Sequence, residues 1–309
     1  VITAREAVSL QSAPGSMVLI GGGVIGLELG MVYQKLGTKI TVVELMDQLL
    51  PGTDPDLVRV VQKHLKSGGA DIHLKSKAVK LDKSGGKAKV TIDTEGKEQV
   101  VEADKVLVAV GFKPNSAGIG LESVGVKLDS RGHIAVDERL RTNVPSIYAI
   151  GDVAGMPYLA HKASKEGEIA AEVIAGHKSA RDYRGMPAAI FTDPEIATVG
   201  ITETEAKAQG KKVKIGKFPF AASGRAMAVS ETDGFIKVII DEADNQLLGV
   251  AIVGPEASDL ICESALALEM CAFAEDVALT VHPHPTLGEG FMDAFKHAWG
   301  EAVNIMKRR

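Results

Sequence analysis

Residues 17–26 read MVLIGGGVIG, and this stretch decides the fold. Its four apolar residues predict a short strand, and the glycines that follow have the G-x-G-x-x-G spacing of a turn that opens a helix. Gly21 permits the tight turn, Gly23 lets the backbone approach a pyrophosphate, and Gly26 lets helix and strand pack closely. The helix N-terminus then offers free N–H groups to the phosphates, so the stretch predicts a dinucleotide site.

An acidic residue ends the next expected strand. Glu44 follows the apolar run 40–43, about twenty residues after the glycines, where a carboxylate accepts hydrogen bonds from ribose hydroxyls and repels a 2′-phosphate. No arginine stands in the next residues, 45–48 (LMDQ). The pattern favours NAD over NADP, and the alternative is a plain glycine turn with a surface glutamate.

Strand-like and helix-like patterns alternate up to about residue 110. This β-α-β order predicts a parallel sheet with right-handed crossovers, together with a hairpin that turns at Ser84-Gly85-Gly86. The expected strands are 17–20, 40–43, one that begins at 72, 79–81, 88–92 and 105–110, and the expected helices are 26–36 and 54–65.

The rest of the chain has a different pattern. Residues 111–185 are loop-rich, with one expected strand at 146–150 and one expected helix at 160–175. From residue 186 strands precede helices, which predicts an α+β domain, and Thr202-x-x-Glu205 is a capping box that opens a short helix. The expected strands there are 188–192, 213–218, 234–240 and 247–253, and the expected helices are 255–270 and 286–302.

Composition restricts the class of protein. A chain of 309 residues with 45% hydrophobic residues is expected to form two or three globular domains. A net charge of −5 argues against a nucleic-acid partner. The sequence contains no apolar run of about 18 residues, so no membrane span is expected. The first residues lack a signal-peptide pattern, and two cysteines argue against a secreted scaffold, so a cytoplasmic location is expected. Cys262 and Cys271 are interpreted as small buried hydrophobic residues.

Six blocks, in one order, carry a family resemblance. The chain resembles the pyridine nucleotide–disulfide oxidoreductases, in particular those members that oxidise dihydrolipoamide with NAD. The resemblance implies a Rossmann-like NAD-binding domain at 1–112, the end of an FAD-binding domain at 113–185 and an α+β dimerisation domain at 186–309. It also implies FAD and NAD as cofactors and a homodimer. The blocks are 21–28 (GGGVIGLE), 110–115 (VGFKPN), 142–152 (TNVPSIYAIGD), 159–167 (LAHKASKEG), 191–200 (FTDPEIATVG) and 282–289 (HPHPTLGE).

Flavin-binding residues follow from this resemblance. Asp152 matches the aspartate that hydrogen-bonds the ribityl chain of the flavin. Leu159, Ala160 and His161 match the block that supplies backbone donors near the isoalloxazine, and a helix beginning there would direct its positive end at the N1–O2 edge. Gly111 is included among the cofactor-binding residues on the same resemblance.

Two further residues are implied to act as an acid–base pair. His284 matches the family's base, which takes a proton from a dithiol and reaches into the partner's active site, and Glu289 matches the glutamate that holds its other ring nitrogen. His282 does not match the base by position. Metal binding by this H-P-H-P run is disfavoured, because no cysteine or carboxylate set stands at metal spacing. Glu28 is implied to lie near nicotinamide and flavin, paired with a lysine of a first lobe; by itself it reads as an ordinary solvated helix residue.

The family's redox disulfide, C-x-x-x-x-C, is missing from this sequence, and so is a second G-x-G-x-x-G for the FAD adenylate. Both belong to a first lobe, which is expected either before Val1 or on a separate polypeptide. With that lobe, the expected substrate is the dihydrolipoyl group of a 2-oxo acid dehydrogenase complex or of the glycine cleavage system. The alternatives are an NAD-binding and dimerisation module without turnover, or another disulfide oxidoreductase. Glu44 disfavours an NADP-linked glutathione reductase, and the tail 305–309 lacks the paired cysteines of a mercuric reductase.

Overall fold

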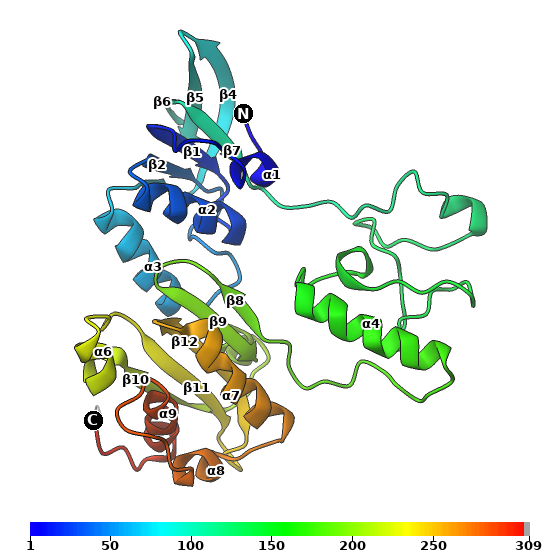
Figure 1. Cartoon of the computed structure of the whole chain (residues 1–309), viewed down its shortest axis with the longest axis vertical. Helices are drawn as coiled ribbons and strands as arrows, with labels where there is room; N and C mark the ends of the chain where they lie inside the picture. Colours follow the sequence, from blue (N-terminus) through cyan, green and yellow to red (C-terminus); the bar gives the residue numbers. More distant parts are fainter. Residues whose placement is uncertain (306–309) are drawn as a thin grey trace. The chain divides into compact units, whose positions relative to one another are not determined.

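The computed structural model describes residues 1–305, apart from the side chain of Ser84, and divides into two compact units (Figure 1). Unit 1 is formed by Val1–Val110 together with the chain from Pro187 onward, and unit 2 is Gly111–Met186. The first and third expected segments therefore pack together, and the division into three domains stays a prediction. Of the tail 305–309, whose lack of paired cysteines was noted above, residues 306–309 lie outside the described residues.

The first part of unit 1 is a parallel sheet in the order β3-β2-β1-β7. Successive residues of the strand β1 point to opposite faces of the sheet. Met17 and Leu19 pack against the helices, and Val18 packs against the antiparallel strands β4-β5-β6. A strand covered on both faces reads as an unbroken apolar run, which is why MVLI was recognisable. The elements are α1 (Ala4–Ala7), β1 (Ser16–Ile20), α2 (Val24–Lys35), β2 (Lys39–Val43), α3 (Pro55–Ser67), β3 (Asp71–His73), β4 (Ser76–Ser84), β5 (Lys87–Thr94), β6 (Lys97–Ala103) and β7 (Lys105–Val108).

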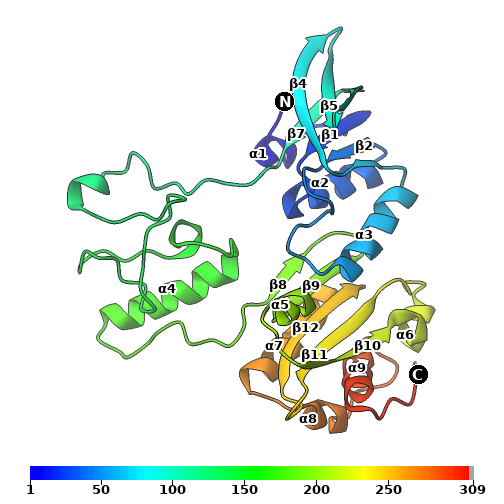
Figure 2. The same ribbon diagram turned by 180° about the vertical axis from the view of Figure 1, so that it is seen from behind.

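The second part of unit 1 is an antiparallel sheet in the order β10-β11-β12-β9-β8, with helices packed against it (Figures 1 and 2). Thr202 and Glu205 form the expected capping box. The predicted combination of α/β and α+β architecture is confirmed. The elements are β8 (Ala188–Ile190), β9 (Glu195–Gly200), α5 (Glu203–Ala208), β10 (Val213–Pro219), η3 (Phe220–Ala222), α6 (Gly224–Ala228), β11 (Phe235–Asp241), β12 (Leu247–Gly254), α7 (Ala257–Glu269), α8 (Ala274–Leu279) and α9 (Glu289–Trp299).

A buried ion cluster joins the two parts of unit 1. Lys237 on β11 is fully buried, and its Nζ donates to Asp54 at 2.7 Å and to Asp56 at 3.0 Å. Asp54 precedes α3, and its carboxylate also accepts the backbone N–H groups of Glu203 and Thr204 at the start of α5. Burial alone would raise the pKa of Asp54, but the hydrogen bonds from Lys237 and Thr204 hold that pKa at about 2. The cluster therefore keeps its charges near neutral pH.

Unit 2 contains little regular structure: η1 (Glu122–Val124), η2 (Gly151–Ala154) and α4 (Ala160–Ile174). The prediction of a strand at 146–150 is wrong. Tyr148 makes only an isolated bridge with Arg141, because a strand needs a neighbouring strand to pair with and the described residues supply none there. The carbonyl of Ile147 instead accepts the amide and the hydroxyl of Thr142, which closes a turn.

The interpretation of the cysteines as buried is also wrong. Cys262 is exposed and Cys271 is partly exposed. Helix α7 buries the face that contains Ile261, Ser264 and Leu268, and Cys262 lies outside that face. The apolar character of a cysteine did not decide its place, because the helical spacing of its larger neighbours sets which face turns inward.

Candidate functional site

The glycine turn between β1 and α2 has the geometry that the spacing predicts. Gly21 has a φ of +104°, and a Cβ there would lie 2.4 Å from the carbonyl oxygen of Ala109. A Cβ on Gly26 would lie 2.5 Å from the carbonyl oxygen of Gly21. Gly23 differs, because a Cβ there would meet nothing within 4 Å among the described residues. Gly21 and Gly26 are thus needed for the close packing of the turn, and the space beside Gly23 is open.

The N-terminus of α2 and Glu44 border this turn. The N-cap, Gly23, has no side chain to accept the first N–H groups of the helix, so these donors are available to an anion. Glu44 is buried at 7% exposure, and it accepts the N–H of Gly22 at 2.6 Å and that of Met46 at 2.7 Å, one on each oxygen. A carboxylate oxygen has about two acceptor sites, so each can still accept a ribose hydroxyl. This combination of N–H donors and carboxylate acceptors fits a dinucleotide.

Glu28 has a partner that the sequence did not predict. Its Oε1 accepts the backbone N–H of Phe191 at 2.8 Å, and Phe191 follows β8 with 60% of its surface exposed. The interpretation as an ordinary solvated helix residue is therefore wrong, because 163 positions separate the two residues and no local pattern reports such a contact. The bond connects α2 to the second part of unit 1.

His284 and Glu289 form a hydrogen-bonded pair at the start of α9. Nδ1 of His284 lies 2.9 Å from Oε1 of Glu289, and the backbone N–H of Thr286 donates to Oε2 at 2.8 Å. Burial alone would raise the pKa of Glu289, but the bonds from Thr286 and His284 hold that pKa below its usual value. The carboxylate thus favours the tautomer with a proton on Nδ1, which leaves a lone pair on Nε2. The His284 side chain is 78% exposed, so Nε2 is accessible to a substrate.

The neighbouring His282 is held in the opposite way. Its side chain is only 6% exposed, with Nδ1 at 2.9 Å from the carbonyl oxygen of Thr280 and Nε2 at 2.9 Å from Oε1 of Glu263. Both ring nitrogens are therefore engaged, and His282 anchors the loop while His284 projects from it.

The remaining expected site residues lie in unit 2. Gly111 is exposed with a φ of +106°, and Asp152 is exposed within η2. Leu159 is the N-cap of α4, and Ala160 and His161 begin the helix with their surfaces exposed. No side chain caps the N-terminus of this helix. This arrangement fits part of a flavin site.

Two buried charged residues on α4, which the sequence did not reveal, hold the backbone of the η2 segment by hydrogen bonds. Lys162, at 2% exposure, donates from Nζ to the carbonyls of Gly151 and Gly155 at 3.1 and 2.8 Å. Glu166, one turn later, is fully buried and accepts the N–H of Gly151 at 2.7 Å. The i,i+4 spacing of a lysine and a glutamate was the available signal, although most such pairs are solvated.

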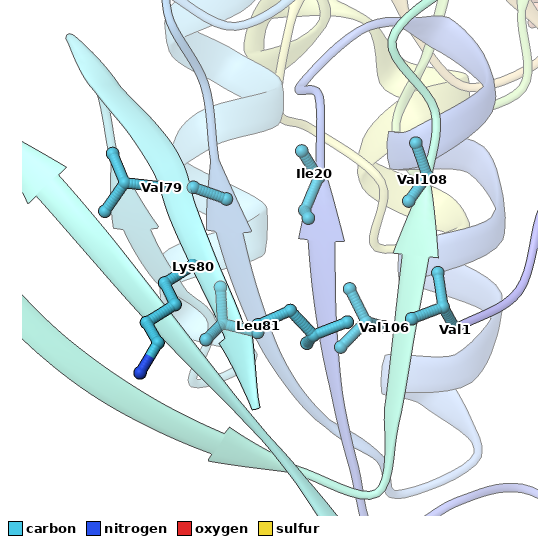
Figure 3. Close-up of a pocket in the computed structure, with 9 residues that line it drawn as sticks. Val1, Ile20, Val79, Lys80, Leu81, Val106 and Val108 are labelled. Carbon is cyan, nitrogen blue, oxygen red and sulfur yellow. The ribbon is translucent and has the colours of Figure 1, made fainter. Parts of the chain in front are cut away.

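An apolar hollow of about 270 Å³ lies between the strands β4-β5-β6 and the parallel sheet (Figure 3). Ile20, Leu81 and Val106 line it, and the ammonium of Lys80 points away from them. A catalytic site needs converging polar groups, so this hollow is not one. The part of the chain that the structure describes also contains no cluster of three or more metal-ligating side chains and no helix fit to cross a membrane.

Comparison with protein families gives two matches. Residues 1–167 match the model described as pyridine nucleotide-disulphide oxidoreductase, and residues 186–295 match the dimerisation domain of the same name. Two curated relatives are dihydrolipoyl dehydrogenases, from Halobacterium salinarum (48% identical over 309 residues) and Geobacillus stearothermophilus (45% identical over 308 residues). Each alignment covers 100% of this chain but only 65% and 66% of those relatives, so the chain spans about two thirds of their length.

Solved structures give the same picture. LpdA from Mycobacterium tuberculosis is 30% identical with a TM-score of 0.89, and the match covers 96% of this chain and 64% of that protein. The flavoprotein disulfide reductase RclA from Escherichia coli is 26% identical with a TM-score of 0.88, and the match covers 96% and 67%.

Proposed function

Because this chain belongs to the pyridine nucleotide-disulphide oxidoreductase family, we propose that it is part of an enzyme that oxidises dihydrolipoyl groups with NAD. The observation that supports this most directly is the His284–Glu289 pair, whose geometry suits proton removal from a thiol. The relatives named dihydrolipoyl dehydrogenase match this chain throughout but are longer by about a third of their length. The activity therefore belongs to this chain together with a first lobe, in the same or a separate polypeptide.

The proposed NAD site is built on the glycine turn. The pyrophosphate would meet the free N–H groups of α2 beside Gly23, and the adenosine ribose would hydrogen-bond Glu44, which excludes a 2′-phosphate by charge. Glu28, held by the N–H of Phe191, would stand beside the nicotinamide with its second oxygen unengaged among the described residues.

The proposed flavin site in this chain is partial. Asp152 would bind the ribityl chain, and the backbone of Leu159, Ala160 and His161 would bind the isoalloxazine edge. Gly111 is retained as a cofactor-binding residue on the family resemblance alone. Bound FAD would supply the hydride transfer to NAD, which no amino-acid side chain performs.

His284 would take the proton from the dithiol substrate at Nε2. Glu289 holds Nδ1–H and stabilises the imidazolium that results, so the proton stays on the ring until solvent removes it. The exposure of the imidazole suits a base that must meet the end of a long dihydrolipoyl arm.

We propose a homodimer formed through the face that contains this base. Leu266, Met270, Leu279 and Val281 are all exposed, and Val281 is 93% exposed within the loop that precedes His284. Apolar surface of this kind is covered in stable dimers, and a partner subunit there would enclose the base in an active site. The match to a dimerisation domain supports this assignment.

The proposed partners are the lipoyl-bearing proteins of a 2-oxo acid dehydrogenase complex or of the glycine cleavage system. The cytoplasm is the proposed location, since two cysteines in 309 residues suit a reducing compartment.

The test uses the chain joined to its first lobe and separates the two half-reactions. His284→Gln should slow dihydrolipoamide oxidation by about 10²–10⁴-fold, the usual effect of losing a general base. NADH oxidation by an artificial acceptor needs no proton removal by this imidazole, so it should change less than about twofold. Glu289→Gln should act in the same direction but less strongly, because the ring remains.

His177→Gln is the matched control, since this histidine is exposed in unit 2. Equal losses in both half-reactions for His284→Gln would show that His284 supports the fold and would contradict its role as a base.

A second candidate function is an NAD-binding and dimerisation module without turnover. The absence of C-x-x-x-x-C from this sequence favours it for the chain by itself. The flavin absorbance of the protein as isolated from its own cells distinguishes the two, because a module would bind NADH and dimerise with no flavin present.

A further inference from the structure

Three side chains in unit 2 form a hydrogen-bonded series that the proposed function leaves unexplained. His133 is buried at 4% exposure. Its Nδ1 lies 2.9 Å from Oδ2 of Asp129, and its Nε2 lies 2.7 Å from the hydroxyl of Tyr158. The His133 and Tyr158 rings also contact each other, with centroids 5.9 Å apart.

The order of donors in this series is set by the carboxylate. The hydrogen bonds from His133 and from the backbone N–H of Arg131 hold the pKa of Asp129 at about 2, so Asp129 is charged near neutral pH. It therefore accepts the Nδ1–H of the ring. Nε2 is then the acceptor for the phenol of Tyr158, and the series runs Asp129, His133, Tyr158.

Tyr158 connects this hydrogen-bonded series to the start of α4. Tyr158 directly precedes Leu159, the N-cap of α4, where the chain enters the helix. The residue after His133 makes a second connection, because the N–H of Ile134 donates to the carbonyl of Val153 at 2.8 Å. The turn at 129–134 thus holds both the Asp152 region and the start of α4.

No other side-chain hydrogen bond among the described residues holds Tyr158. Lys162 and Glu166 fasten Gly151 and Gly155, which lie upstream of it. A hydrogen bond to a buried histidine is directional, so the phenol restricts where the backbone of Leu159 and Ala160 can lie.

We propose that Asp129, His133 and Tyr158 form a brace that positions the start of α4 against the flavin, and that Tyr158 is thereby a positioning residue for flavin affinity and potential. The inference rests on the proposed function, which assigns Leu159, Ala160 and His161 to the isoalloxazine. The positive end of a correctly placed helix favours the reduced, anionic flavin over the oxidised form. Loosening the brace therefore weakens binding of both forms, and of the reduced form more.

The experiment uses the chain with its first lobe, stripped of flavin and reconstituted with FAD. Tyr158→Phe removes only the hydroxyl, and it should raise the Kd for FAD about 3–10-fold, the equilibrium effect of roughly one hydrogen bond. If affinity for reduced flavin falls about fivefold more than affinity for oxidised flavin, the midpoint potential falls by about 20 mV, at 29.6 mV per tenfold for two electrons. A loss of general stability would not move the potential in this way.

Tyr148→Phe is the matched control, because Tyr148 lies in the same unit and its hydroxyl makes no hydrogen bond with a described residue. His133→Gln combined with Tyr158→Phe should be no worse than the more severe single variant, since both remove one interaction. Additive losses would overturn the brace.

Two further outcomes separate this inference from the proposed function. Wild-type protein that binds FAD normally, with Tyr158→Phe matching Tyr148→Phe in Kd and potential, would overturn the inference alone. Wild-type protein that takes up no FAD would overturn both.

Discussion

Lys237→Met should destabilise unit 1 strongly, although Lys237 lies outside both proposed cofactor sites. The substitution keeps the length of the side chain and removes the only cation within hydrogen-bonding distance of Asp54 in the described structure, leaving that carboxylate 4% exposed. Removing one partner of a buried ion pair costs about 3–5 kcal/mol, because the other charge stays desolvated. Asp56 keeps a second cation, Lys217, so the loss should fall mainly on Asp54.

The effect should also depend on pH, with a sign that follows from the pKa of Asp54. That pKa falls from 3.8 to about 2 on folding, which contributes about 2 kcal/mol of stability above pH 4. The contribution is lost in the wild type as pH falls from about 4 towards 2. The variant lacks the part that Lys237 contributes at every pH, so the difference between the two proteins should narrow on acidification.

Urea unfolding at pH 7 and at about pH 3 measures both effects, because the contribution of Asp54 is partly lost at the lower pH. The chain has one tryptophan, Trp299 on α9, and it packs against the core of the second part of unit 1, so its fluorescence reports on that core. At a slope of roughly 3 kcal/mol per M, the urea midpoint should shift by about 1 M or more.

Lys63→Met is the matched control, because Lys63 also connects α3 to the second part of unit 1, through Asp233, but is 62% exposed. An exposed pair should contribute less than about 1 kcal/mol. Equal midpoints for Lys237→Met and Lys63→Met would refute the reasoning.

Three further outcomes test the proposed nucleotide site and the proposed dimer. NADH should bind at least about tenfold more tightly than NADPH in a fluorescence titration, because Glu44 repels a 2′-phosphate; tighter NADPH binding would contradict this. Gly21→Ala should lower the melting temperature, since its Cβ would lie 2.4 Å from the carbonyl oxygen of Ala109, while Gly23→Ala should weaken NADH binding about tenfold without changing the melting temperature. Met270→Asp should shift the sedimentation of the chain towards monomer, and an unchanged dimer would place the interface elsewhere.

The sequence predicted the parallel sheet well because its strands are buried on both faces. Val18 and Leu19 face opposite clusters, and such strands appear as continuous apolar runs. The family assignment from six blocks is confirmed. The strand β9 (Glu195–Gly200) and helix α8 (Ala274–Leu279) were missed, since short elements give too few residues to reveal a period.

The geometry of the candidate sites was less predictable than their residues. The bond of Glu28 to the N–H of Phe191 and the cluster around Lys237 join residues more than 150 positions apart, and no local pattern encodes such contacts. His133 was overlooked for a related reason, because its partner Tyr158 lies 25 positions away and becomes a neighbour only after the loops of unit 2 fold.

The cluster around Lys237 also determines when this protein can finish folding during its synthesis. Lys237 follows Asp54 by 183 residues, and the whole of unit 2 is made between them. A ribosome that adds about 5–20 residues per second needs roughly 10–40 s to cover that interval. During that time the nascent chain can form the parallel sheet around β1, but Asp54 has no cation to neutralise it and stays hydrated. The contact between the two parts of unit 1 is thus completed only when β11 leaves the exit tunnel, so the order of synthesis delays the final assembly of unit 1.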